Sequence, residues 1–536
     1  MTLPLPGETP VPVAVTPTWA PLRHPVFRAL WIAQFGGNIG TWAQMVGAQW
    51  LMGDLGGGGL AIGLVQTAAT LPVFLFVVPA GALGDSVDRR KLLLLGQSVM
   101  TVAATVLLLV TVTHVVNPVL LLGLTAVMAA GQGLAAPAFQ AVQPELVGRD
   151  QIPAAALLNG VNANVGRAIG PALGGVLIAA AGPAAAFALN VASFVGLLVV
   201  LARWRREVPP RPLGAERVLA AVRTGARYVR SAPRFGAVLA RSTVFMVFAS
   251  SLWALLPILA RGPLRLGPGG YGLLLGGIGV GAVLGALVVP AIRARAEPGV
   301  VVSAGTLVYA ATLVLTGPSR SVPLVAVTLV VTGLTWVTVL STLNSGAQMV
   351  LPDWTRARAL AYYQLAIMGG QALGGVVWGL VAQLWGASTA LVAAGIGLAV
   401  SLPVGWRWAP MAGPTPDLSA EQHLPDPPDV PVTGLGHVLV LIEWRVPDES
   451  ATAFTEAMRA VGLSRRRTGA TLWGLFRDVE DPECFVEAFT VPDWTEHLRQ
   501  HLERGTAMDR LAEAAARQLV VPGTEPQVRH LVREDS

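Results

Sequence analysis

Long apolar segments separated by short polar stretches fill the first three-quarters of the chain. Each long segment is close to the roughly 20 residues that a helix needs to cross about 30 Å of hydrocarbon. The pattern predicts twelve membrane spans, six in each half of this region. The expected spans are 26–52, 60–83, 92–115, 118–139, 154–181 and 184–201, then 238–260, 270–292, 300–317, 322–343, 359–384 and 388–408.

The pattern changes after residue 408. Residues 409–435 are rich in Pro, Gly and Asp, which is typical of a linker. Farther on, alternating runs predict strands, and amphipathic runs predict helices. The strands are expected at 437–446, 472–478, 484–491 and 527–532, and the helices at 449–462, 492–502 and 507–519. This order predicts a small α+β domain of the ferredoxin-like kind.

The predicted fold class is an all-α polytopic membrane protein with twelve helices in two pseudo-symmetric halves, followed by the α+β domain. The first 20 residues lack a basic start and an apolar core, so we expect a tail and no cleavable signal. The expected parts are a disordered tail (1–25), a six-helix bundle (26–202), a basic cytoplasmic linker (203–237), a second six-helix bundle (238–408), a flexible linker (409–435) and a cytosolic domain (436–536).

Composition and charge agree with a membrane protein. Apolar residues make up 53% of the chain and charged residues 13%, against about a quarter in an ordinary globular domain. Most basic residues between the spans fall on one side by parity, so the positive-inside rule predicts both termini in the cytoplasm. The basic residues are scattered, which favours contact with lipid over nucleic acid. A single cysteine, Cys484, excludes an intrachain disulfide and a thiolate metal cage.

The two halves contain a short internal repeat. The sequence GPALGGV at residues 170–176 recurs as GQALGGV at residues 370–376, in the fifth expected span of each half. The matching positions of the repeat indicate two equivalent halves of six helices.

A charged segment, residues 81–91, connects the second and third spans. Its glycines allow the helix end to turn, and its charges can pair across the halves in one conformation and separate in another. We expect a gating role for Gly81, Gly84, Asp85, Asp88, Arg89 and Arg90. The alternative is that these charges only anchor the segment at the inner membrane surface.

The fifth span combines small residues with one charge. Gly166, Gly170 and Gly174 recur every four residues and share a face, Gly175 lies beside them, and Pro171 bends the helix. We expect this face to slide during gating. Arg167 lies roughly 16 Å along the span, near mid-depth, where an arginine needs water, carbonyls or an anionic substrate. Alternatively, the helix starts later and Arg167 reaches the interface.

Uncharged polar residues could line a cavity between the spans. Gln34, Asn38 and Thr41 share a face of the first span by their spacing. Further candidates for substrate contact are Gln66, Gln132, Asn159, Asn162 and Gln364. The alternative for each residue is a hydrogen bond that joins two helices.

The C-terminal domain offers little chemistry. His497 and His501 are four residues apart on an expected helix, but zinc would need a third ligand from elsewhere, so we expect a solvated helix face. The chain has no phosphate-binding glycine loop, which argues against ATP-driven transport. We expect no cofactor and no resident metal.

Residues 81–91 resemble the loop between helices 2 and 3 of the major facilitator superfamily. Together with PLRHPVFR at 21–28 and GTW at 40–42, they resemble its enterobactin-exporter-like branch, the transmembrane secretion effectors. The fifth span resembles the motif of exporters. Residues 131–136, GQGLAA, are similar to the fourth-helix motif of proton-coupled antiporters, but Ala129 stands where that motif has arginine. The coupling ion therefore stays open.

The C-terminal segments LWGLFRD (472–478) and HLRQH (497–501) are similar to the antibiotic-biosynthesis-monooxygenase-like domain of longer members. The resemblance implies a secondary transporter and not an enzyme. Such a transporter would export a siderophore-like or hydrophobic drug-like molecule across the inner membrane. The resemblance also implies a homodimer through the C-terminal domain. The alternative is a membrane-tethered, cofactor-free oxygenase or regulatory protein that acts through this domain.

Overall fold

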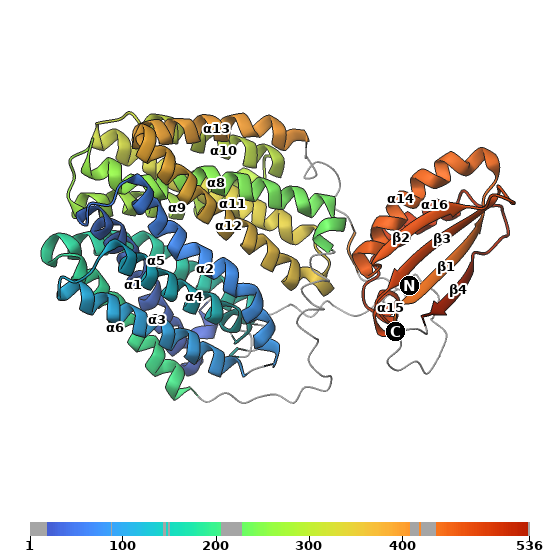
Figure 1. Cartoon of the computed structure of the whole chain (residues 1–536), viewed down its shortest axis with the longest axis horizontal. Coiled ribbons are helices and arrows are strands. Elements are labelled where there is room, and N and C mark those ends of the chain that lie inside the picture. The colour runs from blue at the N-terminus through green and yellow to red at the C-terminus, as the bar shows by residue number, and fades with distance from the viewer. Residues whose placement is uncertain are drawn as a thin grey trace, which may run out of the picture.

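The computed structural model describes residues 19–86, 88–142, 146–147, 151–204, 228–407, 417–419 and 436–533. They form a large helical bundle and a small domain built on a β-sheet (Figure 1). Most of the expected N-terminal tail and most of both expected linkers lie outside the described residues.

Between residues 25 and 407, the described residues form twelve long helices, one for each expected span. Ten of them are long and apolar enough to cross a membrane. The helices are α1 (Pro25–Asp54), α2 (Gly59–Ser86), α3 (Arg89–Val112), α4 (Pro118–Val142), α5 (Ile152–Ala181), α6 (Pro183–Arg203), α8 (Pro233–Arg261), α9 (Pro268–Arg293), α10 (Pro298–Thr316), α11 (Val322–Met349), α12 (Asp353–Trp385) and α13 (Ala387–Arg407).

Proline starts many of these helices. Pro25, Pro183 and Pro268 occupy the first turns of α1, α6 and α9, where the missing N–H is not needed and the fixed φ suits a helix. Arg203, Arg261 and Arg293 lie in the last turns of α6, α8 and α9. Their positive charges favour the negative end of each helix dipole.

The segment at 81–91 differs from the expected loop. Its first six residues continue α2 to Ser86, and its last three begin α3 at Arg89, so only residues 87 and 88 separate the helices. The physical reason is a helix cap. The Asp88 carboxylate accepts a hydrogen bond from the Arg90 N–H at 2.9 Å, which satisfies a free donor and lets α3 start at once.

The two halves of the bundle have the same internal packing. In the first half, α1 packs on α5 and α6, and α4 packs on α2 and α3. In the second half, α8 packs on α12 and α13, and α11 packs on α9 and α10. Across the halves, α5 packs on α9 and α2 packs on α12. This is the arrangement that the repeat predicts, and Figure 1 shows the two halves side by side.

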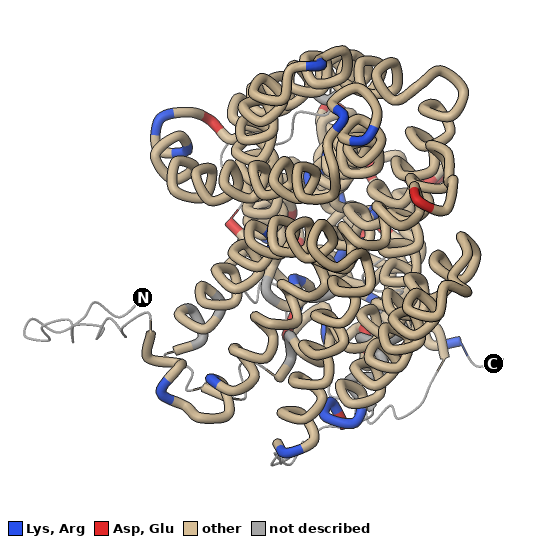
Figure 2. Tube along the Cα trace, turned by 90° about the vertical axis from the view of Figure 1, so that its left-hand side faces the viewer, with Lys and Arg blue, Asp and Glu red and all other residues tan. Residues whose placement is uncertain are grey.

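Charged residues are sparse along the helices. Figure 2 views the molecule from the left-hand end of Figure 1, and most of the helical tube carries neither basic nor acidic residues. Large apolar side chains such as Val102, Leu287 and Val400 are exposed on the outside of the bundle. Such a surface suits a lipid environment.

The C-terminal domain is a four-stranded antiparallel sheet with helices on one face (Figure 1). The strand order is β2-β3-β1-β4. The elements are β1 (Val438–Arg445), α14 (Ala451–Thr468), β2 (Leu472–Arg477), β3 (Cys484–Val491), α15 (Trp494–Leu502), α16 (Ala507–Arg517) and β4 (Gln527–Val532). Trp444, Phe454, Phe485 and Phe489 fill the space between sheet and helices. All seven strands and helices expected from the sequence are present.

The domain contacts the bundle at the start of α12. The Arg504 guanidinium carbon lies 5.2 Å from the centroid of the Trp354 ring, a cation–π arrangement. The ring of Tyr228, shortly before α8, packs edge-on against Trp354 with centroids 5.9 Å apart. Burial raises the pKa of Tyr228 to about 12, so its hydroxyl stays protonated at neutral pH.

Candidate functional site

The repeated glycines bring helices from the two halves into close contact. A Cβ atom on Gly175 would lie 2.7 Å from the Gly272 Cα atom of α9. A Cβ atom on Gly375 would lie 3.0 Å from the Gly63 carbonyl oxygen of α2. Only glycine allows the backbones to approach this closely. The repeat therefore supplies a glycine to the α5–α9 contact and to the α12–α2 contact between the halves.

The other members of the repeat face within their own half. Gly170 and Gly174 lie against Trp42 and Ala43 of α1, whereas Gly370 and Gly374 lie against the equivalent part of α8. Gly166 lies against Asn38, and Pro171 is buried within α5.

A cavity of about 360 Å³ lies among the middle parts of α1, α2, α3, α4, α6 and α12. Its wall contains four of the residues that the sequence suggests for substrate contact: Thr41, Gln66, Gln132 and Gln364. Since α12 belongs to the second half and the other helices to the first, both halves contribute to the wall. The volume falls in the range of small-molecule sites, about 300–1,000 Å³.

Three other suggested residues bond to one another or to the backbone instead. The Asn38 amide donates to Asn162 Oδ1 at 2.8 Å, Gln34 donates to Asn38 Oδ1 at 3.3 Å, and Asn162 donates to the Trp31 carbonyl at 2.9 Å. The two bonds of Asn162 connect α1 with α5, whereas the bond between Gln34 and Asn38 lies within α1. In this conformation Asn38 and Asn162 are interhelical contacts, which is the alternative that the sequence left open.

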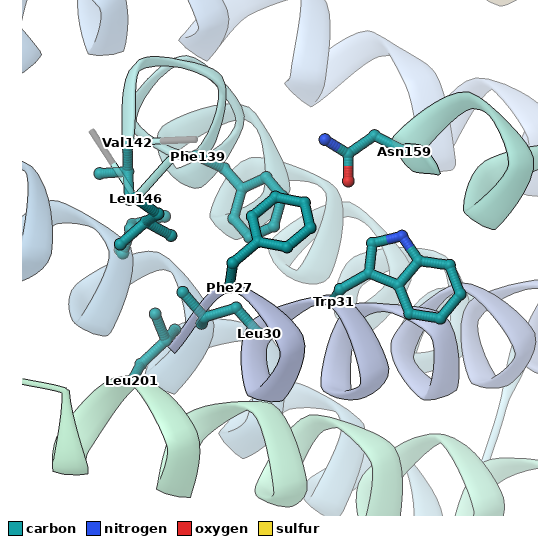
Figure 3. A pocket seen from close by; sticks show the side chains of 9 residues that line it. Phe27, Leu30, Trp31, Phe139, Val142, Leu146, Asn159 and Leu201 are labelled. Atoms are coloured by element: carbon teal, nitrogen blue, oxygen red, sulfur yellow. The ribbon is translucent and has the colours of Figure 1, made fainter. Parts of the chain in front are cut away.

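Asn159 lies in a different and much smaller pocket, with a volume of about 10 Å³. Figure 3 shows its carboxamide opposite Trp31, with Phe27 and Phe139 beside it. The remaining wall is mostly leucine and valine, so this pocket holds no ligand of useful size.

Arg167 lies in the middle of α5, as its position in the sequence suggests. Its guanidinium carbon is 5.5 Å from the centroid of the Trp42 ring, and Trp42 lines the 360 Å³ cavity. Arg167 is not among the residues that line this cavity. Its Nε atom is buried and has no hydrogen-bond partner among the described residues. Trp42 therefore contacts both the guanidinium and the cavity, whereas Arg167 does not line the cavity.

Two of the suggested gating residues have local partners. Asp88 caps α3, and Arg90 donates to the carbonyls of Leu201 and Ala202 at 3.3 and 2.7 Å. Those carbonyls lie in the last turn of α6, where a cation stabilises the helix end. Arg89 is the first residue of α3. Gly81, Gly84 and Asp85 lie in α2, at positions whose side-chain surroundings the structure does not describe.

A contact that the sequence analysis missed joins the far ends of α1 and α8. Arg261 Nη1 lies 2.8 Å from Asp54 Oδ1, and its guanidinium carbon lies 3.8 Å from the Trp50 ring centroid. One turn deeper, Gln49 donates to the Trp253 carbonyl at 2.9 Å and accepts a hydrogen bond from the Tyr271 hydroxyl. Polar residues on α1 thus close this end of the gap between the halves.

Further cavity residues also escaped the sequence analysis. They include Trp42, Gln44, Asn190 and Gln371, and four methionines: Met45, Met100, Met128 and Met368. Gln371 occupies the position of Pro171 in the repeat, which is a signal that could have identified it. The methionines carry no comparable signal, because apolar residues occupy every face of these helices.

Comparison with known proteins identifies the family. The model of the transmembrane secretion effector family matches residues 16–536. The chain belongs to this family of major facilitator transporters. The match extends through the C-terminal domain.

Individual relatives agree with the family. Enterobactin exporter EntS of Salmonella choleraesuis is 28% identical over 287 residues, which cover 53% of this chain and 68% of EntS. EntS of Shigella boydii serotype 4 is 28% identical over 300 residues, with the same coverage. This transmembrane secretion effector is therefore a small-molecule exporter that spans the membrane several times, and it is a transporter, not an enzyme.

Solved structures share the fold of the bundle. A POT family transporter in complex with 5-aminolevulinic acid has a TM-score of 0.62 at 15% identity, covering 72% of this chain and 96% of its own. Nucleoside transporter NupG has a TM-score of 0.55 at 13% identity, covering 72% and 98%. At such low identity, these likenesses show the fold alone.

The C-terminal domain of this transmembrane secretion effector corrects one expectation. His497 was expected on a solvated helix face, but it is only 1% exposed. Its Nε2 atom lies 3.2 Å from His501 Nε2, and its ring lies 4.8 Å from that of His530. Burial and the neighbouring His501 lower the pKa of His497 to about 3. The helix turns this residue toward the sheet, which periodicity alone did not reveal.

Proposed function

We propose that this exporter works by alternating access, with twelve spans in two six-helix halves around the 360 Å³ cavity. The observation that carries the proposal is the cavity itself, because residues from α2, α4 and α12 line it at mid-depth and belong to both halves. In a rocking transporter, such a site opens alternately to the two sides of the membrane.

We assign substrate contact to the cavity residues Thr41, Gln66, Gln132 and Gln364. Gln34, Asn38, Asn159, Asn162 and Arg167 remain proposed contacts for another conformation, since α1 and α5 move when the halves rock. Close backbone contacts at Gly175 and Gly375 support the proposal that α5 and α12 slide on α9 and α2.

We propose that the segment containing Gly81, Gly84, Asp85, Asp88, Arg89 and Arg90 restrains one conformation at the inner surface. Two sets of hydrogen bonds support a part of this, because Asp88 caps the start of α3 and Arg90 fixes that start to the end of α6. A rigid segment of this kind gives the rest of the first half a fixed point about which to move.

The proposed location is the inner membrane, with both termini in the cytoplasm and lipid around the bundle. The basic residues between the spans support this orientation through the positive-inside rule. It puts the Asp54–Arg261 pair at the outer surface. The described conformation is then closed at its outer end, the state in which an exporter would load its substrate from the cytoplasm.

We infer a siderophore-like or hydrophobic drug-like substrate. The support comes from the relatives, whose name gives enterobactin as the exported compound. Methionine and carboxamide side chains in the cavity suit a molecule with both apolar and hydrogen-bonding parts.

We infer that the C-terminal domain is ferredoxin-like, resembles the antibiotic-biosynthesis-monooxygenase type and forms a homodimer. The β-α-β-β-α-α-β order, with two helices where the ferredoxin-like fold has its second helix, and the strand order β2-β3-β1-β4 support the fold. Leu472 and Phe476 of β2 are 71% and 60% exposed on the sheet face away from the helices. An uncovered apolar sheet face supports association with a second copy.

The test uses bacterial cells that lack their own enterobactin exporter. Cells with this protein should release enterobactin into the medium and accumulate less of it than cells without. Gln132→Leu should reduce this release, whereas Gln348→Leu, an exposed glutamine in the last turn of α11 outside the cavity, should not. Repeating the assay without the proton gradient tests the coupling ion. Failure of the inserted wild-type protein to export enterobactin or hydrophobic dyes would contradict the proposal.

A further inference from the structure

The cavity has an unusual chemistry for a substrate site. Among the described residues that line it, none carries a charged side chain. Its polar groups are hydroxyls and carboxamides, the latter on Gln44, Gln66, Gln132, Asn190, Gln364 and Gln371. Transfer of an isolated ion into such surroundings costs several kcal/mol, because no opposite charge replaces its water.

Four of these carboxamides are free to bind a ligand. Within the described residues, the side-chain amides of Gln66, Gln132, Gln364 and Gln371 form no hydrogen bond. They come from α2, α4 and α12 and converge on one space. Each amide offers both a donor and an acceptor, so the site can satisfy carbonyl, hydroxyl and amide groups in either sense.

The buried arginine of α5 does not change this chemistry. Arg167 stacks on Trp42, which lines the cavity, but Arg167 is not itself among the lining residues. The wall between the amides is apolar and deformable, because Met45, Met100, Met128 and Met368 contribute flexible thioethers. Such a wall accepts rings and alkyl groups of varied shape.

We propose that this cavity selects molecules without net charge that combine an apolar body with several amide, carbonyl or hydroxyl groups, and that it rejects anions and cations of the same size. The inference rests on the proposed function, since it names the substrate class of the same site. It predicts selection by charge state more than by shape.

Three dansyl probes of one scaffold test the proposal: dansylamide is neutral, dansylate is an anion and dansylcadaverine is a cation. Binding is measured by fluorescence on the full chain in nanodiscs of zwitterionic lipid, with empty nanodiscs subtracted. We expect dansylamide to bind at least about tenfold more tightly than either charged probe. Absence of dansylamide binding, or equal binding of a charged probe, would overturn the proposal.

Two variants locate the site. Gln132→Glu introduces a negative charge into the wall, so dansylcadaverine should bind about tenfold more tightly than to the wild type and dansylate should not. Gln132→Lys should favour dansylate in the same way. The matched control Gln348→Glu adds its charge outside the cavity and should leave all three affinities unchanged. If Gln132→Glu and Gln348→Glu behave alike, the probes bind elsewhere and the inference is wrong.

The export assay separates this inference from the proposed function. If cells export enterobactin while dansylate binds as tightly as dansylamide, the substrate class is wrong and the transport function remains. If cells export no compound while dansylamide binds with the predicted selectivity, the function is wrong and the charge selectivity of the cavity remains.

Discussion

Arg261 and Asp54 form an ion pair that joins the two halves, with Nη1 and Oδ1 2.8 Å apart. The first residue is in the last turn of α8 and the second ends α1. Stacking of the guanidinium on Trp50 fixes the arginine in place. Because the partners belong to different halves, separation of these helix ends must break the pair.

This relationship predicts that a covalent link at the same place blocks transport. Asp54→Cys and Arg261→Cys are combined with Cys484→Ser, which removes the single native thiol. A reductant-cleavable bismaleimide should stop export because the ends can no longer separate, and reduction should restore it. Single-cysteine variants treated in the same way are the control. Full export by the crosslinked protein would show that this end does not open.

The glycine contacts predict a second effect. A Cβ atom at Gly63 would lie 2.4 Å from the Gly375 carbonyl oxygen, a distance that no side chain tolerates. Gly63→Ala must push α2 away from α12 and cost roughly 1–3 kcal/mol in the closed arrangement. We expect export to fall about tenfold or more, measured at equal amounts of inserted protein.

Gly123→Ala is the matched control for this substitution. Gly123 lies in α4, and a Cβ atom there would meet nothing within 4 Å. Export by this variant should equal that of the wild type. Equal losses in both variants would mean that the effect comes from helix propensity and not from contact between the halves.

Hydrophobic length predicted the helices well because each span must cover the same thickness of hydrocarbon. The boundaries were least accurate where a helix continues into water. The span expected at 322–343 extends to Met349, and the one expected at 359–384 begins at Asp353. Hydropathy detects the apolar part of such a helix and not its polar end.

The cavity was harder to predict because spacing reveals which residues share a face but not what that face meets. Asn38 and Thr41 were expected together, yet Asn38 bonds to Asn162 whereas Thr41 lines the cavity. The side chain of Trp42 was missed because tryptophan is common in membrane helices. The partners of each face depend on contacts between distant segments.

An amide that joins two helices and an amide that lines the cavity should respond differently to substitution by leucine. Asn162→Leu removes the bonds to Asn38 and Trp31 and should lower the stability of the α1–α5 contact by roughly 1 kcal/mol. The midpoint of thermal unfolding should fall, with little change in the affinity for dansylamide. Gln132→Leu should lower that affinity and leave the midpoint near its wild-type value. The opposite pattern would mean that Asn162 contacts the ligand and that Gln132 stabilises the helix packing.

The position of Arg167 allows a test of charge selectivity. Since its guanidinium stacks on Trp42 and does not line the cavity, Arg167→Met should act through the position of the indole ring. We expect export of neutral compounds and any residual export of anionic compounds to fall by the same factor, while Arg167→Lys retains more of both because it keeps the cation. A loss confined to anionic compounds would instead indicate direct contact between Arg167 and the substrate.

Burial of His497 predicts a pH-dependent stability of the C-terminal domain. Its pKa is lowered from 6.5 to about 3 in the folded domain, so below pH 6.5 only the unfolded chain takes up the proton. The free energy of unfolding of the domain is therefore unaffected by His497 well above pH 6.5, and it decreases as the pH falls from 6.5 toward 3. At about pH 5 the decrease is roughly 2 kcal/mol. Hydrogen exchange over residues 438–532 of the full chain measures this change.

The variant His497→Gln should show a weaker pH dependence over the same interval, although it starts from a lower stability. Part of the dependence should remain, because burial also lowers the pKa of the neighbouring His530. His437→Gln changes an exposed histidine of the same domain and should leave the wild-type profile unchanged. A profile for His497→Gln as steep as that of the wild type would mean that other groups control the acid sensitivity of this domain.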